Sequence, residues 1–229
     1  MIWEVEVGGS SDKDAVGTEA GVAQQTAREI IAAWNTLARS GLLGGSTGDV
    51  SLLIDGAEAV WMTPHIPFAE SVAVRDLLQI TLEGRVRRRR ARPSASAMMH
   101  LGIYRRRPDV RAIVHSRAPY VTLLGVCEVP VPPVTVDAIP FTDLPRVSVG
   151  ITNKQEWPDR VSNALADGAV AALLLHGGMV AVGADLKEVV RRTLALEETA
   201  RVLVISHLLS QVPSSFSAEE VETLRQVWY

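Results

Sequence analysis

The stretch that decides the fold is PDVRAIVHSRAPY, residues 108–120. Its centre, residues 112–115, is a short apolar run that ends on His115, which is typical of a buried strand. Pro119 is the residue type that often opens a helix, so the spacing predicts a helix over residues 119–126. We therefore expect a strand and a helix joined by a short turn. His115 and Arg117 would lie at the end of that strand, where catalytic groups are commonly presented.

Helical and strand patterns alternate on both sides of this unit. Residues 18–40 carry apolar side chains at helical spacing, and two short runs, 50–54 and 59–62, predict a hairpin. A proline-rich stretch at residues 130–145 cannot be a central strand. The remaining predicted elements are a strand at 77–80, helices at 95–106 and 157–167, strands at 169–175 and 179–182, and a long helix at 185–209.

The chain is predicted to form a single domain over residues 18–229. It has 229 residues and 47% hydrophobic content, which is ample for one buried core. There is no internal repeat and no second apolar region behind a linker. Residues 5–17 are polar and rich in glycine, serine and aspartate, without periodicity. We therefore expect residues 1–17 to form a flexible N-terminal arm.

Composition argues against nucleic-acid and membrane partners. The formal net charge is −3, so the chain as a whole has no field that attracts polyanions. The basic run from Arg85 to Arg92 contains no aromatic side chains for base stacking and is predicted to be a solvated loop. No segment reaches the ~20 apolar residues of a membrane span. Cys127 is the only cysteine, which excludes an intramolecular disulfide and fits a cytoplasmic location.

Four segments, in their order, resemble the class II aldolase/adducin superfamily, which includes fuculose-phosphate aldolase, ribulose-phosphate 4-epimerase and the adducin head. The segments are GSTGDVS at 45–51, MTPH at 62–65, the stretch from Gly84 to Tyr120, and LLLHGGMVAVG at 173–183. The resemblance implies a three-layer α/β/α domain with a central, mostly antiparallel sheet. It also implies self-association as a homotetramer, because relatives build their sites between neighbouring subunits.

The metal site of that superfamily is degenerate in this chain. The resemblance implies a divalent metal, usually zinc, and a glutamate that moves the proton. The family's His-x-His pair becomes His115-Ser116-Arg117, the third histidine falls on Gly177 with His176 one place early, and the glutamate is Ser96. A guanidinium has no lone pair and repels cations, so Arg117 cannot replace a ligand. Only His115 matches, and we expect no zinc and no other cofactor.

The phosphate loop of the superfamily is altered as well. Asp49 stands where the family usually has asparagine, and His65 ends a shortened turn. A carboxylate in the pocket would repel a phosphate, so we expect a non-phosphorylated substrate. The predicted substrate-binding residues are Thr47, Gly48, Asp49, His65, Ser94, Ser96, His176 and Gly177.

These features predict a divergent, metal-independent lyase of the class II aldolase type that acts on a small carbonyl compound or acid. His115 would move a proton, and Arg117 would stabilise an enolate or carboxylate. Carbon–carbon cleavage, decarboxylation and dehydration all pass through such charge. Two alternatives stay open: a noncatalytic scaffold like the adducin head, and a metal-dependent aldolase with a rearranged ligand set that uses His115 and His176.

Overall fold

A computed structural model describes residues 13–43, 48–54, 59–65, 72–88, 92–148 and 156–228. The strands are β1 Asp49–Leu53, β2 Ala59–Met62, β3 Leu78–Thr81, β4 Val86–Arg88, β5 Ala112–Ser116, β6 Arg146–Ser148, β7 Ala171–Leu175 and β8 Gly178–Gly183. They form one sheet in the order β4-β3-β2-β1-β5-β8-β7-β6. Every neighbouring pair is antiparallel except β6 and β7, which are parallel.

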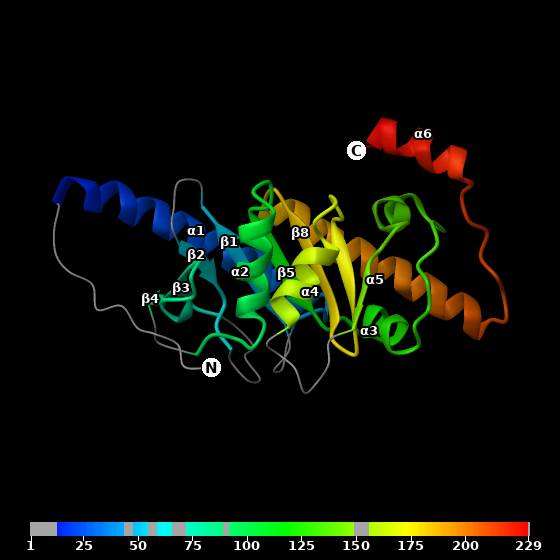
Figure 1. The fold of residues 1–229 in the computed structure, drawn as a ribbon, viewed down its shortest axis with the longest axis horizontal. Coiled ribbons are helices and arrows are strands. Elements are labelled where there is room, and N and C mark those ends of the chain that lie inside the picture. The colour runs from blue at the N-terminus through cyan, green and yellow to red at the C-terminus, as the bar shows by residue number, and fades with distance from the viewer. Residues whose placement is uncertain are drawn as a thin grey trace.

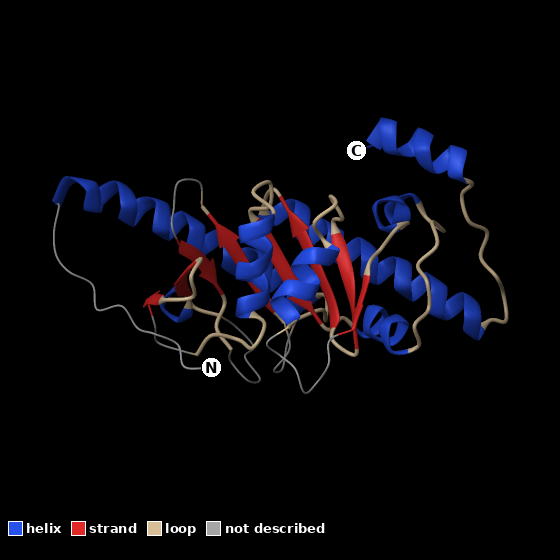
Figure 2. Cartoon of the chain, in the orientation of Figure 1, coloured by secondary structure: helices blue, strands red, loops and turns tan. Residues whose placement is uncertain are grey.

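Helices cover both faces of the sheet (Figure 1 and Figure 2). The helices are α1 Lys13–Arg39, α2 Ala97–Arg106, α3 Pro119–Val126, α4 Trp157–Ala164, α5 Leu186–Leu208 and α6 Ala218–Trp228, with short 3-10 helices η1 Val74–Asp76 and η2 Val136–Phe141. One buried apolar core contains side chains of α1, α3 and α5, and a second contains those of α2 and α4. This arrangement confirms the predicted three-layer α/β/α fold with a mostly antiparallel sheet.

Strand alternation decides which helices face the functional side chains. Along β5, Val114 belongs to the core beneath α1, α3 and α5, whereas Ile113 belongs to the core beneath α2 and α4. Because side chains alternate along a strand, His115 shares the face of Ile113. Asp49 pairs directly with His115, and Ser51 pairs with Ile113. Asp49, Ser51 and His115 therefore all lie on the face that α2 covers.

Two predicted loops are partly regular structure. The helix α1 begins at Lys13, so residues 13–17 are helical where the sequence shows no periodicity, while residues 1–12 lie outside the described residues. A single glycine such as Gly17 does not end a helix, because its cost inside a helix is only about 1 kcal/mol. The basic run starts in β4, an edge strand paired with β3, because Val86 is fully buried. Residues 89–91 of that run lie outside the described residues.

Two further elements were not predicted. The strand β6 has three residues and follows the proline-rich stretch, where it extends the sheet beside β7. The helix α6 follows α5 and packs on η2 through few contacts (Figure 1). Within the described ranges, no helix combines the length and the apolar composition needed to cross a membrane.

Candidate functional site

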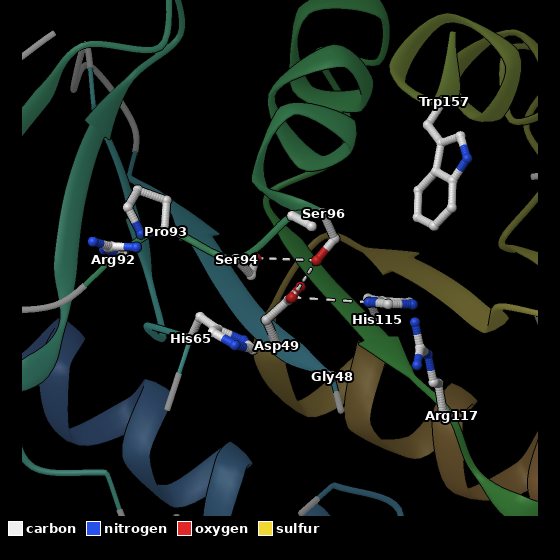
Figure 3. A pocket seen from close by; sticks show the side chains of 11 residues that line it. Gly48, Asp49, His65, Arg92, Pro93, Ser94, Ser96, His115, Arg117 and Trp157 are labelled. Atoms are coloured by element: carbon white, nitrogen blue, oxygen red, sulfur yellow. Dashed lines mark hydrogen bonds and ion pairs between the residues drawn. The ribbon is translucent and has the colours of Figure 1, made fainter. Parts of the chain in front are cut away.

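A pocket of about 290 Å³ opens beside the start of β1, the end of β5 and the start of α2 (Figure 3). It brings together seven of the predicted site residues: Gly48, Asp49, His65, Ser94, Ser96, His115 and Arg117. These residues come from four separate parts of the chain. The pairing of β1 with β5 joins two of those parts, because it places Asp49 directly opposite His115.

Three predicted residues are not among the described residues that line the pocket. Thr47 lies outside the described residues. His176 is exposed in the turn between β7 and β8 and does not line the pocket. Its backbone has a positive φ of 63°. The turn instead contributes a backbone group, because the carbonyl oxygen of Gly177 lies 3.0 Å from Nε2 of His115.

Asp49 is the most connected polar side chain of the pocket and is almost fully buried. The hydroxyl of Ser96 donates a hydrogen bond to its Oδ2, and the hydroxyl of Ser94 lies 3.0 Å from that of Ser96 (Figure 3). Ser96 has a single proton and gives it to the carboxylate, so Ser94 donates to Ser96. On the other side, Nε2 of His100 lies 2.7 Å from Oδ1 in an ion-pair contact.

Asp49 is held as an anion. Burial alone raises the pKa of this carboxyl, but the charges and close polar contacts of His100 and His115 outweigh burial and hold the pKa of Asp49 well below its ordinary value. The pocket therefore has a fixed negative charge at its base, and the imidazole of His100 contacts that carboxylate from below.

The hydrogen bonding of His115 defines which of its nitrogens can act as a base. A carbonyl oxygen only accepts, so Nε2 of His115 carries the proton of the contact with Gly177. The lone pair of neutral His115 is then on Nδ1, which is buried and has no hydrogen-bond partner among the described residues. Nδ1 lies 3.8 Å from Oδ2 of Asp49, close enough for the carboxylate to stabilise a protonated imidazole.

Arg117 is presented by a tightly fixed turn between β5 and α3. The hydroxyl of Ser116 donates to the carbonyl of Leu42 at 2.6 Å and accepts from the backbone N–H of Ala118 at 3.1 Å. Gly178 has a φ of 87°, and a Cβ there would lie 2.1 Å from the carbonyl oxygen of Ser116. Glycine is therefore required for the close approach of the β7–β8 turn.

The start of α3, just after Arg117, is clamped from α5. Both carboxylate oxygens of Glu197 accept backbone N–H groups, from Tyr120 at 3.0 Å and from Val121 at 2.9 Å. The Arg117 side chain itself is exposed on the pocket wall. The turn thus has a backbone held by several hydrogen bonds and a guanidinium that is open to the pocket.

The residues present do not fit the zinc ion of the family. Nε2 of His115 is used by Gly177, Ser96 donates to Asp49, and Arg117 adds a positive charge to the same wall. Among the described residues, no group of three or more histidine, cysteine, aspartate or glutamate side chains is arranged to hold a metal ion. The rearranged set with His115 and His176 is not assembled either.

The sequence prediction missed Arg92, Pro93, Ala95 and Trp157, which complete the pocket wall. It also left His100 out of the site and did not connect it with Asp49. A signal was available: residues 96, 100 and 104 are four apart, so one face of α2 presents Ser96, His100 and Tyr104 to β1. Trp157 and Arg92 each flank a segment outside the described residues, and no spacing placed them beside His115.

Comparison with known proteins gives consistent matches. Residues 28–204 match the family described as Class II Aldolase and Adducin N-terminal domain. The chain is 31% identical to the 5-methylthioribulose-1-phosphate/5-deoxyribulose-1-phosphate aldolase of Rhodospirillum rubrum, covering 80% of this chain and 81% of that protein. It is 32% identical to the 3-oxo-tetronate 4-phosphate decarboxylase of Pectobacterium atrosepticum, covering 82% and 89%.

The fold is shared with solved structures. The crystal structure of YgbL from Klebsiella pneumoniae, described as an aldolase, epimerase or decarboxylase, superposes with a TM-score of 0.80 at 27% identity. The match covers 88% of this chain and 98% of that protein.

Proposed function

Because the chain belongs to the Class II Aldolase and Adducin N-terminal domain family, whose named relatives here are lyases, we propose that it is a lyase that works without a bound metal ion. One observation carries the proposal. The unpaired Nδ1 of His115 lies beside the Asp49 carboxylate, with Arg117 on the same pocket wall. A base, its counter-ion and a fixed cation are the groups that cleavage next to a carbonyl requires.

In a retro-aldol step, Nδ1 of His115 accepts the proton of a hydroxyl group two carbons from a carbonyl. The O–H electrons form a new C=O bond, the carbon–carbon bond breaks, and its electrons move to the carbonyl oxygen of the other fragment as an enolate. Arg117 stabilises that oxyanion, and Asp49 stabilises the imidazolium. His115 then returns the proton to the enolate carbon, so the enzyme ends the cycle unchanged.

Decarboxylation of a 3-oxo acid places the same demands on Arg117. The carboxylate carbon leaves as CO₂, the electrons of the broken bond form an enolate, and protonated His115 supplies the proton to carbon. His115 then regains a proton from solvent, so the reaction consumes one proton overall. The two reactions differ in the state of His115 at the start, neutral for the aldol cleavage and protonated for the decarboxylation. The pocket thus supports the lyase class more firmly than either reaction.

The substrate that we propose is a small, non-phosphorylated carbonyl compound with a carboxylate. Arg92 and Arg117 both line the pocket, and the side chains lie on opposite sides of it in Figure 3. Both relatives are named for phosphorylated compounds. The charge of Asp49 no longer argues against phosphate, since His100 offsets it. The support comes from the shortened turn, where the His65 amide donates to the Arg92 carbonyl at 2.9 Å and is not free for a phosphate.

The test is turnover by metal-depleted protein. Protein dialysed against a strong chelator should cleave or decarboxylate at least one member of a panel of 3-oxo acids and hydroxy-keto acids, and added zinc should leave the rate unchanged. Each acid is assayed beside its phosphorylated counterpart, and we expect the non-phosphorylated compound to have the higher kcat/KM. Activity that appears only with zinc would contradict metal independence. Turnover of no compound, with or without metal, would favour the scaffold alternative.

We also propose that the chain self-associates as a homotetramer. Leu208, Leu209 and Val212, near the end of α5, are 76%, 66% and 95% exposed. Adjacent large apolar side chains with that exposure favour contact with another chain. Multi-angle light scattering at micromolar concentration should give four times the 24.7 kDa chain mass. The buffer needs a thiol reductant, because a disulfide between exposed Cys127 side chains would link two chains covalently. We propose that the protein is located in the reducing cytoplasm. A monomeric mass would contradict the proposal.

A further inference from the structure

A buried line of polar groups runs from the base of the pocket into the layer between α2 and the sheet. From Asp49 Oδ1 it passes to Nε2 of His100 at 2.7 Å, and from Nδ1 of His100 to the Ser51 hydroxyl at 2.7 Å. The Ser51 hydroxyl lies 2.8 Å from that of Tyr104, which donates to the carbonyl of Arg111 at 3.2 Å. The four side chains are at most 3% exposed, so the line is shielded from bulk water.

The direction of each hydrogen bond follows from the far end of the line. The Arg111 carbonyl only accepts, so for every contact of the line to be a hydrogen bond at once, the Tyr104 hydroxyl must donate its single proton there. Burial raises the pKa of Tyr104, so this phenol keeps its proton. The Ser51 hydroxyl must then donate to Tyr104, and Ser51 can only accept from His100. Nδ1 of His100 therefore carries a proton.

The near end of the line requires a proton on the other ring nitrogen. Nε2 of His100 is 2.7 Å from a carboxylate oxygen of Asp49. A lone pair at that distance from an anionic oxygen would repel it, so Nε2 must also carry a proton. The contact is a close ion pair rather than a well-aligned hydrogen bond. With protons on both nitrogens, the imidazole of His100 is a cation.

We propose that His100 is a buried imidazolium that serves as the fixed counter-ion of Asp49. His100 is a positioning residue: it does not line the pocket and acts on His115 only through the Asp49 carboxylate. Its protonation is independent of any reaction, whereas its value for catalysis rests on the proposed function. By holding Asp49 anionic, His100 keeps a negative charge beside His115. That charge stabilises the imidazolium that forms when His115 accepts a proton.

The pair of Asp49 and His100 also determines the net charge at the base of the pocket, where a substrate would bind. A carboxylate with no counter-ion would make the base of the pocket negative, opposing an anionic substrate. With His100 beneath it, the pair is neutral as a unit, and Arg92 and Arg117 give the pocket wall its net positive charge. The buried histidine thus allows one site to contain both a carboxylate for His115 and a binding surface for an anion.

The experiment observes the imidazole directly. The full-length protein, labelled with ¹⁵N in its histidines, is studied without substrate at neutral pH, and the five histidines are assigned through bonds. We expect both nitrogens of His100 to show directly attached protons in slow exchange, as buried N–H groups do. A His100 ring with one unprotonated nitrogen would overturn the proposal. The matched variant Asp49→Asn keeps the shape and removes the charge, and in it His100 should lose one of its two protons.

Activity measurements keep this inference separate from the proposed lyase function. A doubly protonated His100 in a protein that turns over no substrate would refute the lyase and leave the ion pair standing. An active enzyme with a neutral His100 would support the lyase function and refute the buried imidazolium. Tyr104→Phe removes only the hydroxyl that directs Ser51, so Ser51 becomes free to donate to Nδ1. We expect weaker protection of the Nδ1 proton in that variant, and unchanged protection would contradict the direction assigned to the line.

Discussion

Replacing Arg117 with alanine should lower kcat/KM by about 100- to 1,000-fold, because the variant loses the fixed charge that stabilises the developing oxyanion. Losing one such charge-assisted contact typically costs about 2.7–4 kcal/mol of transition-state stabilisation. Arg117→Lys keeps the charge but loses the planar fork of donors, so its activity should fall between wild type and alanine. Steady-state kinetics on a substrate identified with the metal-depleted protein measure this series.

Two further variants serve as controls for this series. Arg39, at the end of α1, is an exposed arginine outside the pocket, and Arg39→Ala should leave kcat/KM unchanged. Arg117→His restores the family's His-x-His pair without the other ligands, so we expect weak metal uptake and no gain in activity. If Arg117→Ala folds and turns over substrate at the wild-type rate, the arginine is structural and the mechanism is wrong.

The fold could be predicted because its deciding signals are local. The apolar run that ends at His115 and the proline at 119 are four positions apart in sequence. The structure contains a strand that ends at Ser116 and a helix that starts at Pro119. The elements that were missed lack such signals. The three-residue strand β6 is too short for alternation to be recognised, and between residues 218 and 227 of α6 only Val221 is buried.

The site was predictable where one strand carries it and less so where the sheet assembles it. His115 and Arg117 follow from a single segment. The pairing of Asp49 with His115 depends on the register between β1 and β5, which are more than fifty residues apart. A shift of one residue would turn Asp49 to the other face. The partnership of Asp49 with His100 needs that register and the docking of α2, so the sequence predicted a bare carboxylate where the structure has an ion pair.

Removing the Asp49 side chain should be the most destabilising change among the pocket residues. Asp49→Ala leaves His100 with no counter-ion in a fully buried position, and breaking a buried pair from one side typically costs about 3–5 kcal/mol. Asp49→Asn retains an acceptor for Ser96 and lets His100 become neutral, so it should cost about 1 kcal/mol. For comparison, Asp109 pairs with Arg107 but has a side chain 62% exposed, and Asp109→Ala should cost less than about 1 kcal/mol.

The pH dependence separates lost charge from lost packing. The pKa of Asp49 is lowered in the folded protein, whereas an unfolded aspartate titrates near ~3.9. Its contribution to the free energy of unfolding is therefore fully present above about pH 5 and is lost as pH falls through and below that unfolded value. Asp49→Ala lacks this dependence, so urea unfolding should show a larger difference from wild type near pH 5 than near pH 3. A difference that stays constant with pH would mean that Asp49 stabilises the fold by packing and that its ion pair with His100 contributes nothing.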